Sequence, residues 1–408
     1  DVHMSRGLGD VYKRQGSTST TITVGSIVND SLDEVDETVI VTLSNPTNAD
    51  PGSILVHTYT ISDNDNAPVI DFNATSSSGA ESASSQSLTV DLSAASGQDV
   101  TVNYAVTGTA SGSGTDYTLA NGTLTISAGA TTGNIDISGI IDDSIDEADE
   151  TVVVTLSSPS NATLGSDKVH TFTITDNDNP PVVDFNATSS SGAESVTSAD
   201  LTVDLSAASG QDVTVNYAVT GTAAGSGTDY TLANGTLTIS AGSTSETISI
   251  GSIVNDSIDE ADETVIVTLS SPGNATLGSD SVHTYTITDN DDPPVVDFNA
   301  TSSSGAESTS SKAVTVDLSA ASGQDVTVDY AVTGSATGAG TDYTLTNGTL
   351  TISAGATSGT ITIAGIVDDE LAEANETVII TLSGPSNAVL GNDSVHTYTI
   401  NDDDGIPE

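Results

Sequence analysis

The stretch Val213-Thr-Val-Asn-Tyr-Ala-Val219 alternates apolar and polar side chains along its length. Successive residues of a β-strand point to opposite faces of the sheet, so this period of two predicts a strand with one buried face. The same alternation marks Leu201–Leu205, Leu237–Ile239 and Val265–Leu269 on either side. No segment sustains the 3.6-residue apolar period of a helix. This region is therefore predicted to be all-β.

Three further apolar runs, Val182–Phe185, Ile248–Ile250 and His283–Ile287, bring the number of predicted strands to seven. Clusters of Gly, Asn, Asp and Ser, such as Ser209–Asp212, mark the turns between them. Seven short alternating strands in a unit of this size predict an antiparallel β-sandwich of immunoglobulin-like type.

The unit is repeated along the chain. The sequence Asp-Phe-Asn-Ala-Thr-Ser-Ser-Ser-Gly-Ala-Glu-Ser begins at Asp71, Asp184 and Asp297, so the period is 113 residues, the size of a whole domain. We predict the C-terminal half of one repeat at 16–67 and three full repeats at 68–180, 181–293 and 294–408. Residues 1–15 match no repeat and are interpreted as a non-native or unstructured segment. We expect the chain to be part of a longer polypeptide.

The chain is strongly acidic. It holds 57 Asp and Glu against 5 Lys and Arg, a formal net charge of −52. This balance excludes a nucleic-acid binder and argues against docking on anionic membranes. The chain has no cysteine, so it has neither disulfides nor thiolate metal sites. It also has no apolar run long enough to insert into a membrane. Such acidity with few aromatic residues is also typical of disordered chains, but those lack the alternating apolar rows seen here.

The carboxylates gather outside the alternating strands. One cluster reads Asp142-Asp-Ser-Ile-Asp-Glu-Ala-Asp-Glu150, and each repeat ends in a second cluster such as Asp176-Asn-Asp178. Two like charges about 5 Å apart repel by roughly 3 kcal/mol at an effective dielectric constant near 20. Beyond residue 15, only Lys168 and Lys312 are available as basic partners. Oxygen-only ligands favour a hard cation, and many flexible carboxylates favour Ca²⁺ over Mg²⁺. The alternative is that these are turn residues that keep the surface soluble.

Five motifs occur in order and resemble the Calx-beta domain over residues 16–408. In the first full repeat they are Asp71-Phe72…Glu81, Gly108-Thr-Ala…Asp116-Tyr117, Asn121-Gly-Thr-Leu-Thr-Ile, Asp142-Asp-x-Ile-x-Glu-x-x-Glu150 and Thr173-Ile-Thr-Asp-Asn-Asp178. The resemblance implies a seven-stranded sandwich that binds several Ca²⁺ ions at one end, with four of the five motifs supplying the ligands.

Carried over by position, the resemblance implies nine ligands per full repeat. In the first they are Glu81, Asp116, Asp142, Asp143, the carbonyl of Ile145, Glu147, Glu150, Asp176 and Asp178. In the second they are Glu194, Asp229, Asn255, Asp256, Ile258, Glu260, Glu263, Asp289 and Asp291. In the third they are Glu307, Asp342, Asp368, Asp369, Leu371, Glu373, Glu376, Asp402 and Asp404. Because Asn255 lacks a charge that Asp368 carries, we expect the third repeat to bind Ca²⁺ more tightly, or with more ions, than the second.

These features lead us to expect a non-catalytic, calcium-binding spacer or adhesion region of a large extracellular or cell-surface protein, stiffened by Ca²⁺ at its junctions. We expect its protein or carbohydrate partners to bind through domains outside this sequence. A calcium-sensing regulatory region of a membrane transporter and a non-catalytic region of a secreted enzyme stay open as alternatives. Cadherin-like linkers are a further alternative for Asp63–Pro68, although the cadherin Asp-Arg-Glu motif is missing.

Overall fold

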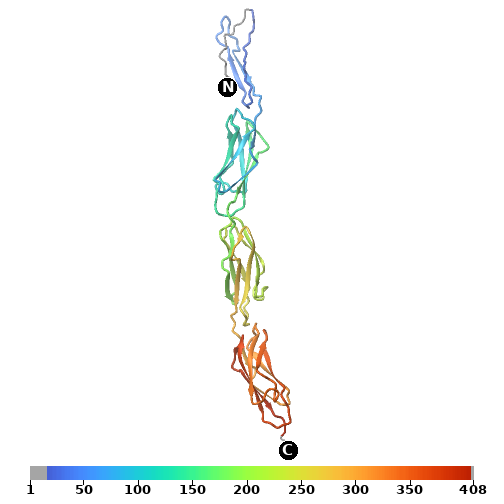
Figure 1. Ribbon diagram of the computed structural model, residues 1–408. Coiled ribbons are helices and arrows are strands. Elements are labelled where there is room, and N and C mark those ends of the chain that lie inside the picture. Colours follow the sequence, from blue (N-terminus) through green and yellow to red (C-terminus); the bar gives the residue numbers. More distant parts are fainter. Residues whose placement is uncertain (1–15, 406–408) are drawn as a thin grey trace. The chain divides into compact units, whose positions relative to one another are not determined.

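Every element of the computed structural model, which describes residues 16–405, is a β-strand (Figure 1). The tandem β-sandwich architecture predicted from the period of two is thereby confirmed. No helix in this part of the chain is long and apolar enough to cross a membrane. The segment 1–15, predicted to be non-native or unstructured, lies outside the described residues. The chain divides into two compact units between Asn179 and Pro180.

Each full repeat contains nine strands. Those of the first are β3 (Val69–Phe72), β4 (Ser76–Ala80), β5 (Ser85–Leu92), β6 (Val100–Gly108), β7 (Gly122–Ile126), β8 (Thr132–Ser138), β9 (Glu150–Ser160), β10 (Thr163–Leu164) and β11 (Val169–Thr175). Those of the second are β12 (Val182–Phe185), β13 (Ser189–Ala193), β14 (Ser198–Leu205), β15 (Val213–Gly221), β16 (Gly235–Ile239), β17 (Ser245–Gly251), β18 (Glu263–Gly273), β19 (Thr276–Leu277) and β20 (Val282–Thr288). Those of the third are β21 (Val295–Phe298), β22 (Ser302–Ala306), β23 (Ser311–Leu318), β24 (Val326–Gly334), β25 (Gly348–Ile352), β26 (Ser358–Ala364), β27 (Glu376–Ser386), β28 (Val389–Leu390) and β29 (Val395–Asn401).

The strands of each full repeat form two sheets. In the first repeat the order is β10-β3-β5-β8 in one sheet and β4-β11-β9-β6-β7 in the other, and both later repeats have the same order. The apolar side chains of the two inner faces form a separate core in each full repeat. Each full repeat is thus a two-layer sandwich around its own core.

The seven predicted strands of a repeat are all present, and two more accompany them. β4 and its counterparts read Ser-Ser-Ser-Gly-Ala and pair in parallel with the last strand of the repeat, while the two-residue β10 pairs in parallel with β3. Neither carries an alternating apolar pattern, because both lie at sheet edges and bury little side-chain surface. The sequence pattern could not reveal them.

A buried histidine fixes the serine-rich strand β4. His170 Nδ1 donates to the carbonyl oxygen of Ala74 (2.6 Å), and its Nε2 lies 2.7 Å from the Ser77 hydroxyl. Since a carbonyl only accepts, the neutral ring satisfies both contacts with Nδ1 protonated and Nε2 accepting from Ser77. The ring also packs 5.5 Å from Phe72. These contacts hold β4 beside β11.

The half repeat at 16–67 contains one two-stranded sheet, β1 (Glu37–Thr42) with β2 (Val56–Ile61). Its apolar residues stay open to solvent, with Ile40 63% and Tyr59 40% exposed. None of residues 16–67 is fully buried.

Candidate metal centre

The ends of four strands bring the acidic residues of the first full repeat together. β4 and β11 run in parallel with Ala80 opposite Thr175, so the next residues, Glu81 and Asp176, leave the sheet side by side. The Glu81 amide donates to the Thr175 carbonyl oxygen (3.1 Å) and keeps this register beyond the strands. A glutamate and an aspartate 95 positions apart are thus placed at one edge.

The same edge receives the β6–β7 loop and the loop before β9, residues 142–149, here called the acidic loop, with counterparts at 255–262 and 368–375. Glu150 lies opposite Ile174 at the start of β9, and Gly108 lies opposite Val152 at the end of β6. Gly108 has a φ of +140°, and a Cβ there would lie 2.0 Å from the Thr151 carbonyl oxygen. Only glycine permits this approach, which directs the following loop toward the acidic residues.

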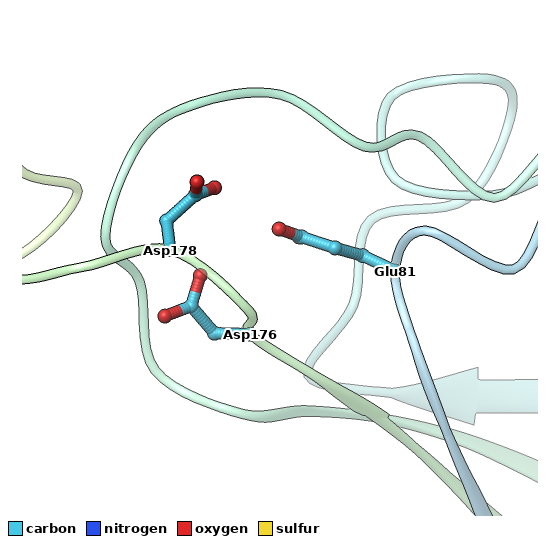
Figure 2. A group of neighbouring side chains, drawn as sticks. All are labelled: Glu81, Asp176 and Asp178. Atoms are coloured by element: carbon cyan, nitrogen blue, oxygen red, sulfur yellow. The ribbon is translucent and has the colours of Figure 1, made fainter.

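Three carboxylates surround one point at this edge. Glu81, Asp176 and Asp178 each offer an oxygen within 4.8 Å of the other two, and Figure 2 shows Glu81 directed toward the two aspartates. Glu81 is only 7% exposed. Asp176 Oδ1 and Asp178 Oδ2 are buried with no hydrogen-bond partner. Buried acceptors without a donor are rare in native proteins, so these oxygens call for a positively charged partner.

A second group lies in the same pocket. Asp116, Glu147 and Glu150 line it together with Glu81, Asp143 and Asp176, around a partly open cavity of about 30 Å³. A volume of this order has room for a water molecule or an ion. The Asp116 carbonyl oxygen accepts from the Ile141 amide (3.0 Å), which fastens the β6–β7 loop to the start of the acidic loop.

Burial and mutual repulsion disturb the protonation of these groups. Desolvation, followed by the charges of Asp176 and Asp178, raises the pKa of Glu81 to about 7. Desolvation and contact with Asp116 raise the pKa of Glu150 to about 7. Desolvation and Asp143 also raise the pKa of Glu147. All these shifts disfavour the charged form, as expected for carboxylates that are packed together without a cation.

The acidic loop is held by its own side chains. Asp143 Oδ1 accepts from the Ile145 amide (2.8 Å), a turn that fixes the backbone around the predicted carbonyl ligand. Asp149 Oδ1 accepts from the Asp176 amide (3.1 Å) and joins this loop to the other cluster. Asp149 was not among the predicted site residues. Its position within the acidic stretch was visible, but its contact with a segment 27 residues away was not.

The side-chain amide of Asn177 lies between two of the carboxylates. Asn177 Nδ2 donates to Glu81 Oε1 (3.0 Å) and to Asp142 Oδ1 (2.9 Å). Asp142, predicted as a ligand, is therefore directed toward an amide, and its side chain is exposed. The amide supplies some of the positive charge density that the cluster lacks.

The second full repeat has the same arrangement. Glu194, Asp289 and Asp291 form its three-carboxylate group, and Asp289 Oδ1 and Asp291 Oδ2 are unpartnered. Glu263 contacts Asp229, and desolvation with that contact raises the pKa of Glu263 to about 7. The other predicted positions lie near these groups. The charges of Asp256 and Asp229 act on Glu260, and the backbone amide of Ile258 donates a hydrogen bond to Asp256 Oδ1. Asn255 Oδ1 accepts a hydrogen bond from Asn290 Nδ2.

The third full repeat differs at the amide. Glu307, Asp402 and Asp404 form the usual group, and Glu307, Asp368 and Asp403 form another. Glu307 Oε1, Asp402 Oδ1 and Asp404 Oδ2 are unpartnered. Four of the remaining predicted positions line the pocket of this repeat: Asp342, Asp369, Glu373 and Glu376. The backbone amide of Leu371 donates a hydrogen bond to Asp369 Oδ1.

The donor set fits a hard divalent cation. The candidate ligand atoms are the carboxylate oxygens of these groups, together with the predicted backbone carbonyls. His170, His283 and His396 lie among strand residues with both ring nitrogens in contact with protein oxygens. Such an all-oxygen set suits Ca²⁺ or Mg²⁺, and many flexible carboxylates suit the larger Ca²⁺. Within residues 16–405, the buried oxygens Asp176 Oδ1 and Asp178 Oδ2 and their counterparts have no hydrogen-bond donor.

A family model matches the chain in four consecutive stretches. The Calx-beta domain model matches residues 7–62, 63–178, 176–291 and 289–404. Similar solved structures include CBD12 from CALX1.2 (18% identity, 54% of this chain and 99% of that chain, TM-score 0.27) and the calcium binding domain CBD12 of CALX1.1 (24%, 52%, 82%, 0.27). The apo form of the Calx CBD1 domain is 26% identical over 28% of this chain and 100% of its own, with a TM-score of 0.26. No curated protein sequence matches the chain. The chain belongs to the Calx-beta domain family and carries four tandem matches to it.

Proposed function

We propose that each full repeat binds Ca²⁺ at its acidic end. The observation that carries this proposal is the set of buried carboxylate oxygens without hydrogen-bond partners, Asp176 Oδ1 and Asp178 Oδ2 in the first repeat and their counterparts in the others. A divalent cation neutralises such a group, and the affinity tracks the number of charged ligands and the rigidity of the site. Glu81, Asp176 and Asp178 would hold one ion, and Asp116, Asp143, Glu147 and Glu150 would hold others.

The proposed role is mechanical. In the first two full repeats the second acidic cluster lies directly before the linker to the next repeat, as Asp176–Asp178 lie before Pro180 and Pro181. Ca²⁺ would remove the repulsion within a cluster and order the loops at the junction. We propose that the array is a calcium-stiffened spacer, or adhesion region, of a large extracellular or cell-surface protein. Outside cells, millimolar Ca²⁺ fills most sites with a dissociation constant of about 10⁻⁴ M and about half of those with one of about 10⁻³ M. No catalytic role is proposed for these repeats.

A calcium sensor on a membrane transporter is the second candidate. It is favoured by the family itself, since similar solved structures are described as a calcium binding domain of CALX1.1. The two functions differ in affinity, because an intracellular sensor needs dissociation constants of about 10⁻⁷ to 10⁻⁵ M. The repetition of nearly identical acidic ends favours the spacer.

Titration calorimetry and thermal unfolding of the whole chain test the proposal. We expect heat on addition of CaCl₂, a weaker response to MgCl₂, and a higher melting temperature in Ca²⁺ than in EDTA. Dissociation constants in the millimolar range support the spacer, and micromolar constants support the sensor. The absence of both heat and a melting shift would overturn calcium binding.

A further inference from the structure

Two repeats contact each other through a short turn and an acidic loop. The turn is Ser322-Gly-Gln-Asp325, between β23 and β24 of the third full repeat, here called the Ser-Gly-Gln turn. The Gly323 amide donates to the carbonyl oxygen of Asp259 (3.0 Å) in the acidic loop of the second repeat. The Ser322 hydroxyl lies 3.2 Å from the same carbonyl oxygen and 3.3 Å from Asp259 Oδ2.

The contact is buried. Ser322 is 1% exposed and Asp259 is 8% exposed. The Ser322 hydroxyl also accepts from the Gln324 amide (3.1 Å), and the Ser322 carbonyl accepts from the Gly355 amide (2.8 Å). These bonds leave the hydroxyl hydrogen free to point at Asp259. The turn therefore presents a preorganised pair of donors to the acidic loop.

Space, rather than backbone angle, disfavours a side chain at Gly323. A Cβ at this position would lie 2.7 Å from Glu260 Oε1 and 2.8 Å from Glu260 Cγ. No L-residue other than glycine fits without moving Glu260, which is one of the predicted calcium ligands. Because Gly323 has no side chain, its amide can approach Asp259 in the acidic loop of the second repeat without displacing Glu260.

The same contact recurs at a second junction. The Gly97 amide donates to the Asp33 carbonyl oxygen (3.0 Å), and the Ser96 hydroxyl lies 3.2 Å from it. A Cβ on Gly97 would lie 2.7 Å from Glu34 Cγ. The partners are 63 residues apart in both cases. The contact is thus encoded by the repeat sequence rather than by one junction.

We propose that the acidic loop is a docking surface for the Ser-Gly-Gln turn of the following repeat of the same chain. Asp259 lies between Ile258 and Glu260, which are predicted to hold calcium with their carbonyl and carboxylate. The orientation of the Asp259 carbonyl therefore depends on the same backbone that a bound ion would order. This step rests on the proposed function. We infer that calcium bound in one repeat strengthens the docking of the next repeat and so fixes the angle between the two.

Spin-label distance measurements on the whole chain test this proposal. The chain has no cysteine, so Thr247→Cys on β17 and Thr362→Cys on β26, both exposed strand positions, place one label in each repeat. With Ca²⁺ we expect a narrow distance distribution, and with EDTA a broad one. Gly323→Ala should give the broad distribution even with Ca²⁺. The matched control Gly97→Ala makes the same change at the other junction and should leave this distribution narrow.

A second variant and a second readout separate the possible failures. Ser322→Ala removes the hydroxyl without crowding Glu260 and should broaden the distribution partly, while circular dichroism verifies that each variant is folded. If Gly323→Ala and Ser322→Ala both keep the narrow distribution, the docking proposal is overturned. If Gly323→Ala broadens the distribution but calorimetry detects no calcium heat, docking stands and the proposed calcium function fails. A distribution equally narrow in EDTA and Ca²⁺, with calcium heat present, overturns the coupling between binding and docking.

Discussion

The acidic ends of the second and third full repeats solve one electrostatic problem in two ways. In the second repeat the Asn290 amide donates to Glu194 Oε1 (3.2 Å) and to Asn255 Oδ1 (2.8 Å). In the third, Asp403 and Asp368 occupy the positions of the two asparagines, and they form a carboxylate group with Glu307. The second repeat thus has an amide donor at this position, where the third repeat has a third carboxylate.

The first full repeat is intermediate between them. It keeps the asparagine, Asn177, but pairs it with Asp142 rather than with a second asparagine. The three ends therefore form a series of increasing charge at two positions. Removing a donor leaves a buried acceptor unsatisfied, which costs about 1–3 kcal/mol and more for a charged group. The series predicts that dependence on calcium grows from the second repeat through the first to the third.

We expect the removal of calcium to destabilise the chain more than any substitution discussed below. The third full repeat should lose the most stability. A site filled at ten times its dissociation constant contributes about 1.4 kcal/mol of stability, and we propose several sites in each full repeat. Hydrogen exchange read by mass spectrometry resolves the repeats within one chain. In EDTA, peptides from β27 and β29 should lose more protection than those from β18 and β20. Equal losses in the two repeats would contradict the series.

Asn290 and Asp403 occupy the same position, and exchanging them should give the acidic end of one repeat the properties of the other. Asp403→Asn restores a donor for Glu307, so we expect fewer calcium ions bound by the chain and a metal-free third repeat more stable by about 1–3 kcal/mol. The reciprocal variant Asn290→Asp should add calcium-binding capacity and destabilise the metal-free second repeat. Calorimetric stoichiometry and unfolding in EDTA measure both effects. Unchanged stoichiometry in both variants would show that the amide does not compete with an ion.

The pH dependence of the metal-free chain should reverse the usual direction for carboxylates. Desolvation and neighbouring aspartates raise the pKa of Glu194 and Glu307 to about 7, above the ordinary value of 4.5. Between these values the folded state binds more protons than the unfolded state, so stability falls as pH rises. The stabilising contribution is complete below about pH 4.5 and lost through pH 7.

The measurement is the melting temperature in EDTA from pH 5 to pH 8, where we expect a fall of several degrees. Saturating Ca²⁺ should flatten this slope, because the ion favours the ionised carboxylates over the protonated ones. A melting temperature that rises with pH in EDTA would contradict the argument.

We expect the smallest change in stability from the hydrogen bond that joins the acidic loop to the segment after the last strand of the repeat. Asp262 Oδ1 accepts from the Asp289 amide at 3.1 Å, and Asn375 fills this role for Asp402 at 3.3 Å. Asp262→Asn copies the third repeat and should change the free energy of unfolding by less than about 1 kcal/mol, since an acceptor is kept. Asp262→Ala removes it and should cost about 0.5–1.5 kcal/mol. Urea unfolding compares the two variants, and equal losses would argue against this hydrogen bond.

The strands were more predictable than the site. Alternating rows such as Val213–Val219 reveal strands because burial of one face acts on every second residue. The serine-rich strand β13 (Ser189–Ala193) has no such pattern, since it is fixed by backbone pairing to β20 and by contacts with His283. The resemblance to Calx-beta domains placed Glu194 among the ligands, although its neighbours in the sequence carry no charge.

The sequence by itself determined the repeat length, the alternation that buries one face of each strand, and the excess of carboxylates without basic partners. These are local or compositional properties, and they act wherever the chain is placed. Only the tertiary structure decided which carboxylates lose water. Glu194 meets Asp289 because Ala193 lies opposite Thr288 in a parallel pair, a contact between segments 95 positions apart that leaves no local pattern. The docking of Ser322 on Asp259 was decided in the same way, by two loops that meet only once both repeats have folded.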